Sequence, residues 1–589
     1  MKARLLALLI LPSLLLSSCD SLFGVDNVVK EINVYDIDKL DSDNNLSSGF
    51  QGTVKARCIH GKELVPYLSL KQYASLYEKH FAEDVVSKVE NDTFSNIWTI
   101  QKGEEYYFMC QLNYLTGDVY MAGSIDAAFA SDDDPRDLEA LRYGMFSSTD
   151  NVSLSDKTYS TFSFSGYGIT HFTANKEHYY SLGFLDTTFS FSSSIYFTYN
   201  YAHIISTRDV DKYETYEYVD NGTTYTFDSQ MLANKPDGGI PKYLVEYDTR
   251  LFLYMMDYFY GLKNYKGMKT ATKYYKSTGV YSYLFSTDPE TRTWAFSDAL
   301  SMLDDNHTVL VSVNDTWGNP KYRASRRYGE GCKHRSDIRK ELSEYRSDYY
   351  AGLGKAISSD IIYSADGKTA LFSFDGFSFG KSSQVFNDDK SIKETAKDHD
   401  TFFKLIDAFN RIKAQGTVEN IVLDIALNGG GTVGVMMKLL ALISKDNKAE
   451  LTLYDDTLSV ASNYTARVDI NNDDKFDTDD CFGDEFNFYI LTSDCSFSCG
   501  NAFPCSAQLR KDAKIIGQKS GGGECAVAIH YLPNSEYVYH SSNLHLGSFD
   551  KENNAFIGFE SGATPDIEIA STSNFYNIEY LNTAIANAE

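Results

Sequence analysis

Three side chains of the types used in acyl transfer stand at separate points of the C-terminal half: His307, Ser498 and Glu560. A serine hydroxyl can attack a carbonyl carbon when an imidazole accepts its proton and a carboxylate orients the imidazole. The reaction also needs backbone N–H groups that stabilise the oxyanion. A run of three glycines, 429–431, can expose such groups. These residue types therefore permit hydrolysis of an ester or an amide.

Ser498 lies in the stretch LTSDCSFSCGNAF, residues 491–503. A strand is expected to end at Thr492 and a helix to start near Gly500, which places Ser498 at a strand-to-helix turn. Free amides and the positive end of the helix dipole favour negative charge there. The stretch departs from the G-x-S-x-G nucleophile elbow, because Ser496 stands at the first glycine position. The alternative interpretation is a serine that caps the helix.

The glycine run ends an apolar stretch, IVLDIALNGGGTVG, residues 421–434. Because glycine has no side chain, such a turn lets N–H groups face a ligand closely. A P-loop phosphate site is excluded, since no lysine follows at the required spacing. The turn is therefore predicted either as part of an oxyanion hole or as a flexible loop.

His307 and Glu560 stand next to expected strands. His307 lies in MLDDNHTVL, after a helix and before a strand. Glu560 lies in FIGFESGATPDIEI, between an apolar strand and a Gly-Pro turn. A lone histidine in such a place is equally compatible with a structural role, so the catalytic interpretation depends on the whole set.

An acidic loop, DINNDDKFDTDD, has the spacing of an EF-hand or dockerin calcium loop. Asp474 stands where the sharp turn favours glycine, and position 12 is Asp480 instead of a bidentate glutamate. The alternative is an acidic surface loop. A bound Ca²⁺ would have a structural role, pinning the segment before the Ser498 strand. Positions 1, 3, 5, 7, 9 and 12 are occupied by Asp469, Asn471, Asp473, Lys475 (through its carbonyl), Asp477 and Asp480.

The elements that must position these residues alternate between helix and strand, which predicts an α/β domain. Helical spacing of apolar residues marks the helices, and short apolar runs mark the strands. The expected helices are 243–262, 288–308, 399–416, 431–445 and 500–512, and the expected strands are 369–377, 419–427, 485–493 and 513–518.

The preceding part, 51–230, is predicted to be β-rich, because short alternating strands are separated by Asn, Asp, Ser and Gly. Strands are expected within 106–115, 159–169 and 187–205, and one strand and one helix within 61–81. This region carries no catalytic constellation. It is interpreted as an accessory or recognition region, followed by a linker, NKPDGGIP.

The first residues, MKARLLALLILPSLLLSSCD, have the pattern of a secretory signal over 1–18. The Leu-Ser-Ser-Cys ending resembles a bacterial lipobox, which makes Cys19 the expected lipidation site. The alternative is an ordinary cleaved signal. Residues 19–50 are predicted to be a tether, so the protein is expected at the extracytoplasmic face of a cell membrane, lipid-anchored.

The composition fits an exported protein that is not a nucleic-acid partner. The formal net charge is −27, which disfavours binding to nucleic acid. Eight of the nine cysteines follow Cys19, an even number that permits disulfides. No CxxC pair is present, so neither a disulfide scaffold nor a zinc site is predicted.

The histidine, strand, nucleophile and glutamate segments, in this order, resemble the S41 serine peptidases, the family of C-terminal processing and tricorn-type proteases. The resemblance covers roughly 240–589. It implies a ClpP/crotonase-like peptidase core within 238–589, with a helical lead-in over 238–310. The matching segments are Asp305-Asn306-His307-Thr308, Asp424-Ile425-Ala426-Leu427-Asn428-Gly429-Gly430, Ser496-Phe497-Ser498-Cys499-Gly500-Asn501, Gly517-Gln518-Lys519-Ser520-Gly521-Gly522-Gly523 and Glu560-Ser561-Gly562-Ala563-Thr564-Pro565-Asp566.

The resemblance also implies roles for single residues. One branch of the family uses a Ser–Lys dyad, but its lysine would fall at Gly523, so the resemblance is to the tricorn-like branch with Ser, His and Glu. Ser498 is then the nucleophile, His307 the general base and Glu560 the orienting carboxylate. The amide of Cys499 and an amide of the Gly429–Gly430 turn bind the oxyanion, with Gly430 favoured.

Two departures from the family pattern leave room for altered activity. Ala426 replaces the usual arginine after the strand aspartate, and Asn306 replaces an assisting serine. The gap 317–356 is too small for the PDZ domain that many relatives carry. It holds a basic stretch, 321–340, interpreted either as a site for an acidic substrate or as a solvated loop.

The sequence thus predicts an exported, membrane-anchored serine endopeptidase that acts on a peptide or protein substrate. The alternative is a catalytically inactive surface protein that keeps the fold for binding. No cofactor is expected for catalysis. The Ca²⁺ expected in the acidic loop would be structural. The oligomeric state is left open.

Overall fold

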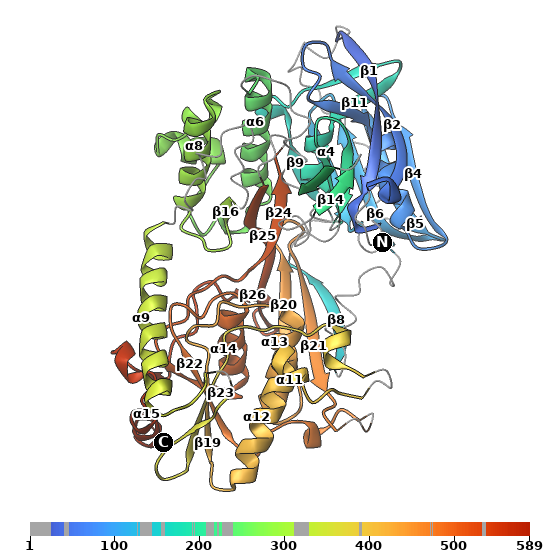
Figure 1. Cartoon of the computed structure of the whole chain (residues 1–589). Coiled ribbons are helices and arrows are strands. Elements are labelled where there is room, and N and C mark those ends of the chain that lie inside the picture. The colour runs from blue at the N-terminus through green and yellow to red at the C-terminus, as the bar shows by residue number, and fades with distance from the viewer. Residues whose placement is uncertain are drawn as a thin grey trace. The chain divides into compact units, whose positions relative to one another are not determined.

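The architecture is described from a computed structural model of the chain (Figure 1). The expected signal 1–18 and Cys19 lie outside the described residues. The structure describes residues 25–39, 46–125, 128–129, 144–154, 159–190, 193, 195–207, 217–220, 223–226, 240–310, 329–357, 359–387, 391–471, 473, 475–532 and 537–588.

The chain forms two compact units that are interleaved in the sequence. Unit 1 comprises Met1–Asp133, Lys157–Tyr328 and Val527–Ser542. Unit 2 comprises Asp134–Asp156, Gly329–Ala526 and Asn543–Glu589. The domain boundaries expected from the sequence stay predictions, but the expected tether, 19–50, contains the paired strand β1 (Asn27–Asp36).

Unit 1 contains two large sheets, of order β10-β11-β3-β2-β1-β13-β12 and β4-β5-β6-β7-β9. Its long pairs are antiparallel, as in β1 with β2 and β5 with β6. The bounds are β1 (Asn27–Asp36), β2 (Phe50–Ile59), β3 (Pro66–Ser69), β4 (Val85–Asn91), β5 (Ser95–Lys102), β6 (Glu105–Asn113), β7 (Asp118–Gly123), β9 (Ser160–Ser163), β10 (His171–Ala174), β11 (Glu177–Ser181), β12 (Tyr196–Tyr199), β13 (Ile204–Thr207), and a separate hairpin, β14 (Glu217–Asp220) with β15 (Thr223–Thr226).

The helices of unit 1 include the expected helical lead-in, and one helix that the sequence pattern did not indicate. The prediction of strand from residue 187 was wrong at its start, because Thr187 and Thr188 belong to helix α4. All but one residue of α4 are buried, so tertiary packing overrides the β preference of its threonines and phenylalanines. The helices are α2 (Leu70–Tyr77), α4 (Leu182–Phe189), α6 (Lys242–Tyr258), α7 (Ala271–Ser277) and α8 (Pro289–Ser301).

Unit 2 is built on a mostly parallel sheet of order β17-β18-β19-β22-β23-β27. The strands β18, β19, β22, β23 and β27 run parallel, and β17 pairs antiparallel at one edge. The register places Leu423 between Phe372 and Ile490. The bounds are β17 (Ile362–Tyr363), β18 (Thr369–Ser373), β19 (Asn420–Asp424), β22 (Asn487–Thr492), β23 (Ala513–Gly517) and β27 (Ile567–Glu568).

Helices cover both faces of this sheet, which explains why its central strands read as continuous apolar runs. Ile421 and Leu423 of β19 pack with helices α12, α13 and α14, whereas Val422 faces α9 and α15. Asp400 caps the start of α12, and Gly416 ends it at φ 75°. The helices are α9 (Glu330–Gly352), α10 (Ser382–Val385), α11 (Ala396–His399), α12 (Thr401–Gln415), α13 (Val433–Ile443), α14 (Cys499–Arg510) and α15 (Ile578–Ala586).

A second sheet of unit 2 includes a strand from far upstream. β8 pairs antiparallel with β21 over nine positions, from Gly144 to Ser153, and β21 pairs with β20. β24 and β25 contribute residues to both units, and the start of β25 pairs with β16 in unit 1. The bounds are β8 (Gly144–Ser153), β16 (Val309–Leu310), β20 (Ala449–Asp455), β21 (Val460–Val468), β24 (Cys525–Tyr531), β25 (Tyr537–Asp550) and β26 (Ala555–Gly558).

The predicted fold class, an α/β C-terminal half after a β-rich N-terminal region, is confirmed. The described cysteines, all after Cys19, are buried thiols that form no disulfide with one another. Within the described residues, no helix combines the length and apolarity that crossing a membrane requires.

Candidate active site

Ser498 sits between the end of β22 and the start of α14 with a backbone that serine rarely adopts. Its φ is 59° and its ψ is −127°, and its hydroxyl makes no capping hydrogen bond to α14. The capping interpretation is therefore wrong for this side chain. Ser498 is half-buried in a run of buried neighbours. A non-glycine residue at such a φ stores strain, which is common where a side chain must face a ligand.

Hydrogen bonds on both sides hold the Ser498 turn in place. The N–H of Ser498 donates to the carbonyl of Gly522 at 3.0 Å, and its carbonyl accepts from Ala502 at 2.8 Å. Buried Ser496 donates through its hydroxyl to the carbonyl of Ile425 at 2.8 Å. The turn is thus attached both to the end of β19 and to the turn after β23.

The glycine turn predicted for the oxyanion lies directly against Ser498. A Cβ added to Gly430 would lie 2.7 Å from Cβ and 3.0 Å from Oγ of Ser498. The φ of Gly430 is 113°, where a side chain is strained in any case. Asn428 joins the two turns, because its carbonyl accepts from Phe497 N–H at 3.1 Å. Only glycine fits this approach.

The two expected oxyanion donors differ in their present partners. The N–H of Gly430 donates to Oδ1 of Asn428 at 2.9 Å, so that bond would have to be shared or opened for Gly430 to bind an oxyanion. Cys499 is the first residue of α14, where an N–H has no acceptor within the helix. Burial raises the pKa of the Cys499 thiol to about 12, so the thiol is neutral and is not a rival nucleophile.

Glu560 is held by the turn that also holds Ser498. Its Oε2 accepts from the N–H groups of Gly523 and Glu524, both at 3.0 Å. The preceding residue, Gly522, accepts from the N–H of Ser498. Unit 2 therefore gathers Ser498, Gly430 and Glu560 around one pair of turns.

Asn501 and Ser520 fasten these turns to α14, and both are buried. Oδ1 of Asn501 accepts from the Ser520 hydroxyl at 2.7 Å, and Nδ2 donates to the carbonyl of Phe559 at 2.9 Å. The Ser520 hydroxyl also accepts from Ala563 N–H at 2.7 Å. Asn501 and Ser520 both lie in segments that match the family pattern, and their side chains hold the turns around Ser498 and Glu560 in place.

Sequence reasoning missed the role of helix α9, which holds the second half of the basic stretch. That half is a helix and not a solvated loop. Arg335 donates to the carbonyls of Asp494 at 2.8 Å and Gly521 at 3.2 Å. Arg339 donates to the carbonyl of Leu427 at 2.9 Å. The signal was available, because arginines four residues apart share one face of a helix.

Arg346, on the same face of α9, lies beside the strand aspartate that precedes Ala426. It binds both carboxylate oxygens of Asp375 at 2.7 Å, and its Nη1 lies 3.6 Å from Oδ2 of the fully buried Asp424. Burial raises the pKa of Asp424, and the Arg346 charge opposes that rise. A cation beside the strand aspartate is therefore present although Ala426 is not an arginine.

His307 belongs to unit 1, whereas Ser498 and Glu560 belong to unit 2. It follows α8 and precedes β16, as predicted, and it is half-buried. Asp305 shapes this turn: its carboxylate accepts from His307 N–H at 3.0 Å, from the Thr308 hydroxyl at 2.6 Å and from the Ser541 hydroxyl at 2.8 Å. Contact between His307 and Ser498 stays a prediction.

The acidic loop is folded on its own polar groups. Asp473 N–H donates to Oδ1 of Asn471 at 2.9 Å and to Oδ1 of Asp469 at 3.2 Å. Asp480, which is buried, accepts at Oδ1 from Ile470 N–H at 2.9 Å. Lys475 binds Asp473 through its ammonium at 2.7 Å. Calcium binding by this loop, including Asp477, stays a prediction.

Comparisons with known structures return proteins of low similarity. A Parabacteroides merdae protein assigned as a peptidase is 17% identical over 54% of this chain and 88% of its own, with a TM-score of 0.37. A Streptococcus agalactiae lipoprotein is 12% identical over 59% and 98%, with a TM-score of 0.33. The photosystem II D1 C-terminal processing protease is 16% identical over 36% and 45%, with a TM-score of 0.25.

The family assignment rests on the sequence. A search of curated proteins returned no match. Residues 389–569 match the model of peptidase family S41. This stretch contains Ser498, Gly430 and Glu560, and it begins after His307. Residues 389–569, which hold Ser498, are therefore similar to peptidase family S41.

Proposed function

We propose that the protein is a serine endopeptidase that uses Ser498, His307 and Glu560, exported and anchored to a membrane through lipidated Cys19. The observation that carries the proposal is the Ser498 turn. Its backbone is strained, its hydroxyl does not cap α14, and it lies in close contact with Gly430. These features are costly for a merely structural serine. They are expected where a hydroxyl must meet a scissile carbonyl.

The proposed reaction follows the logic of a serine triad. Oγ of Ser498 bonds to the carbonyl carbon of the peptide as its proton passes to His307. The Cys499 amide, with an amide of the Gly429–Gly430 turn, stabilises the oxyanion. The protonated histidine then gives its proton to the leaving amine, and water releases the acyl group by the reverse path. Glu560 orients and stabilises this network.

The test is covalent labelling of the purified full chain with a fluorophosphonate probe, in which the serine oxygen displaces fluoride from phosphorus. We expect labelling of the wild type, and losses of at least about 10³-fold in labelling rate for Ser498→Ala and His307→Ala. Ser506→Ala is the matched control. Ser506 is a buried serine of α14 whose hydroxyl has no partner among the described residues.

Three other outcomes would contradict parts of the proposal. Labelling that persists in Ser498→Ala would place the nucleophile elsewhere, and labelling that persists in His307→Ala would exclude that base. A folded wild type that neither labels nor cleaves a denatured protein substrate would favour the inactive binding protein. Labelling is run with Ca²⁺ and with a chelator, because a structural ion at Asp469–Asp480 should raise the labelled fraction.

A further inference from the structure

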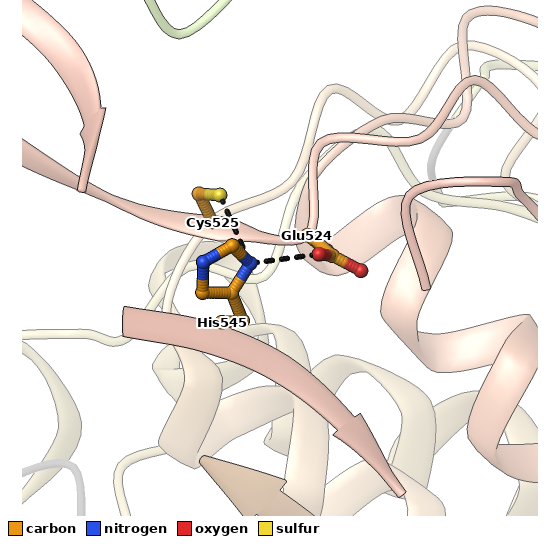
Figure 2. Close-up of side chains that lie close together, drawn as sticks. All are labelled: Glu524, Cys525 and His545. Atoms are coloured by element: carbon orange, nitrogen blue, oxygen red, sulfur yellow. Dashed lines mark hydrogen bonds and ion pairs between the residues drawn. The ribbon is translucent and has the colours of Figure 1, made fainter. Parts of the chain in front are cut away.

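Three potential metal ligands converge where β24 begins and β25 passes beside it (Figure 2). Glu524, Cys525 and His545 are 7%, 1% and 8% exposed. Nδ1 of His545 lies 2.7 Å from Oε1 of Glu524 and 3.5 Å from Sγ of Cys525. One ligand atom from each residue lies within 4.8 Å of the other two. All three residues belong to unit 2.

The arrangement does not fit a second nucleophilic triad. A Cys–His–Glu relay uses both ring nitrogens of the imidazole, one toward the thiol and the other toward the carboxylate. Here the same nitrogen, Nδ1 of His545, faces both Glu524 and Cys525. Three ligand atoms within 4.8 Å of one another are the arrangement that a chelate requires.

We propose that Glu524, Cys525 and His545 bind a divalent transition-metal ion of the zinc class. Thiolate, imidazole and carboxylate are the three ligand types that Zn²⁺ accepts. Tetrahedral zinc, with bonds of about 2.0–2.3 Å, places its ligand atoms about 3.3–3.7 Å apart. The nitrogen–sulfur distance already fits, and the nitrogen–oxygen distance must lengthen by about 0.6 Å. A water or an outside ligand takes the fourth position.

The surrounding hydrogen bonds preorganise the ligands. The N–H of Leu546, next to His545, donates to the carbonyl of Glu524 at 2.9 Å, so the backbone on both sides of the cluster is held in register. Oε2 of Glu524 accepts from Glu560 N–H at 2.7 Å, which leaves Oε1 directed at His545. Partners of this kind orient metal ligands.

The positions of the three ligands also explain why no zinc-binding spacing is visible in the sequence. Glu524 immediately precedes β24, Cys525 is the first residue of β24, and His545 comes from β25, so no CxxC or HxxxH spacing arises. The sheet pairing alone brings the ligands together. An ion here would fix the carboxylate that binds the backbone of Glu560.

The test uses Co²⁺ as a spectroscopic probe on the chelator-treated, reduced full chain. We expect one equivalent to bind, with thiolate-to-cobalt charge transfer in the near ultraviolet, and Zn²⁺ to displace it. Cys525→Ser should abolish this absorption, and His545→Gln should weaken cobalt affinity at least about tenfold. Cys505→Ser, another buried cysteine of unit 2, should leave it unchanged.

Absence of the charge-transfer absorption in the folded wild type, or its persistence in Cys525→Ser, would overturn the proposal. Cobalt bound without this absorption would indicate oxygen ligands such as the acidic loop, and would also overturn it. Circular dichroism tests whether each variant is folded. A variant that does not fold is replaced by Glu524→Gln, which alters the third proposed ligand. The readout is independent of peptidase activity, so failure of the proposed function would leave this result interpretable.

Discussion

At the scale of single residues, Gly430 and Ser498 define the tightest requirement of the site. Gly430→Ala puts a methyl group 2.7 Å from Cβ of Ser498, at a φ of 113°. We expect the rate of fluorophosphonate labelling to fall about 10²-fold, because even a displacement of about 1 Å disrupts a reacting geometry. The measurement is the labelling rate of the folded variant against that of the wild type.

The matched control separates a clash from backbone strain. Gly416 ends α12 at φ 75°, and a Cβ there would meet nothing within 4 Å. Gly416→Ala should therefore cost some stability and leave the labelling rate unchanged. Equal rates for Gly430→Ala and the wild type would show that the glycine turn does not constrain the nucleophile.

Sequence reasoning identified the residues with motif spacing and missed those that act from another element. Ser498, Gly430 and Glu560 follow strands at fixed spacings, so the pattern indicated them, and unit 2 gathers them. Arg346 carries no such mark, since its partners Asp375 and Asp424 are remote in the chain. Side-chain contacts across elements depend on packing that one sequence does not specify.

At the scale of elements, α9 supplies the cation that the buried aspartate of β19 needs. Arg346→Met should lower the free energy of unfolding of unit 2 by about 3–5 kcal/mol, because Asp424 would keep a buried charge without its partner. Hydrogen exchange of the β19 amides measures this loss. Asp424→Asn in the Arg346→Met background should recover part of it.

An exposed ion pair provides the comparison. Lys368 binds Glu419 at 2.9 Å with both side chains more than half exposed. Lys368→Met should change the same exchange by less than about 1 kcal/mol. Similar losses for Lys368→Met and Arg346→Met would contradict the role assigned to α9.

The regular elements of unit 2 were predictable and those of unit 1 were less so. The strand–helix alternation around 401–510 is strongly periodic, and each expected element is present there. Helix α4 was missed because its burial on nearly every side erases the amphipathic pattern. The pairing of β8 with β21 was out of reach, since no local pattern records a partner that distant.

At the scale of the molecule, buried Asp186 makes unit 1 sensitive to alkali. Burial raises the pKa of Asp186 from 3.8 to about 8, so the folded chain holds a proton that the unfolded chain has lost. This contribution to stability is complete below about pH 4 and is lost as the pH rises through 8. Between pH 7 and 8.5 we expect stability to fall by up to about 1.4 kcal/mol per unit.

Urea unfolding followed by tryptophan fluorescence measures this slope, because none of the three tryptophans falls in the sequence of unit 2. Asp186→Asn should flatten the slope. Burial lowers the pKa of His171 and His540 to about 4. Their contributions to stability therefore change below pH 6.5, outside the pH range of this measurement. An unchanged slope in Asp186→Asn would exclude this origin.

The interleaved units also limit how the chain can be divided. A fragment of residues 329–589 lacks β8, so β21 keeps its pairing with β20 and becomes an edge strand whose other side is unpaired. We expect this fragment to aggregate, and a peptide of residues 144–154 to restore a monomer in sedimentation. A reordered peptide of the same composition is the control. A monomeric fragment without peptide would show that β8 is dispensable.

The position of β8 has a further consequence during synthesis. The ribosome releases β8 long before β21, at about 5–20 residues per second, so β8 waits on the order of tens of seconds for its partner. Unit 1 in turn needs residues 527–542, which follow every other segment of that unit. Each unit must therefore wait for a segment made long after its first strands before its fold can be completed.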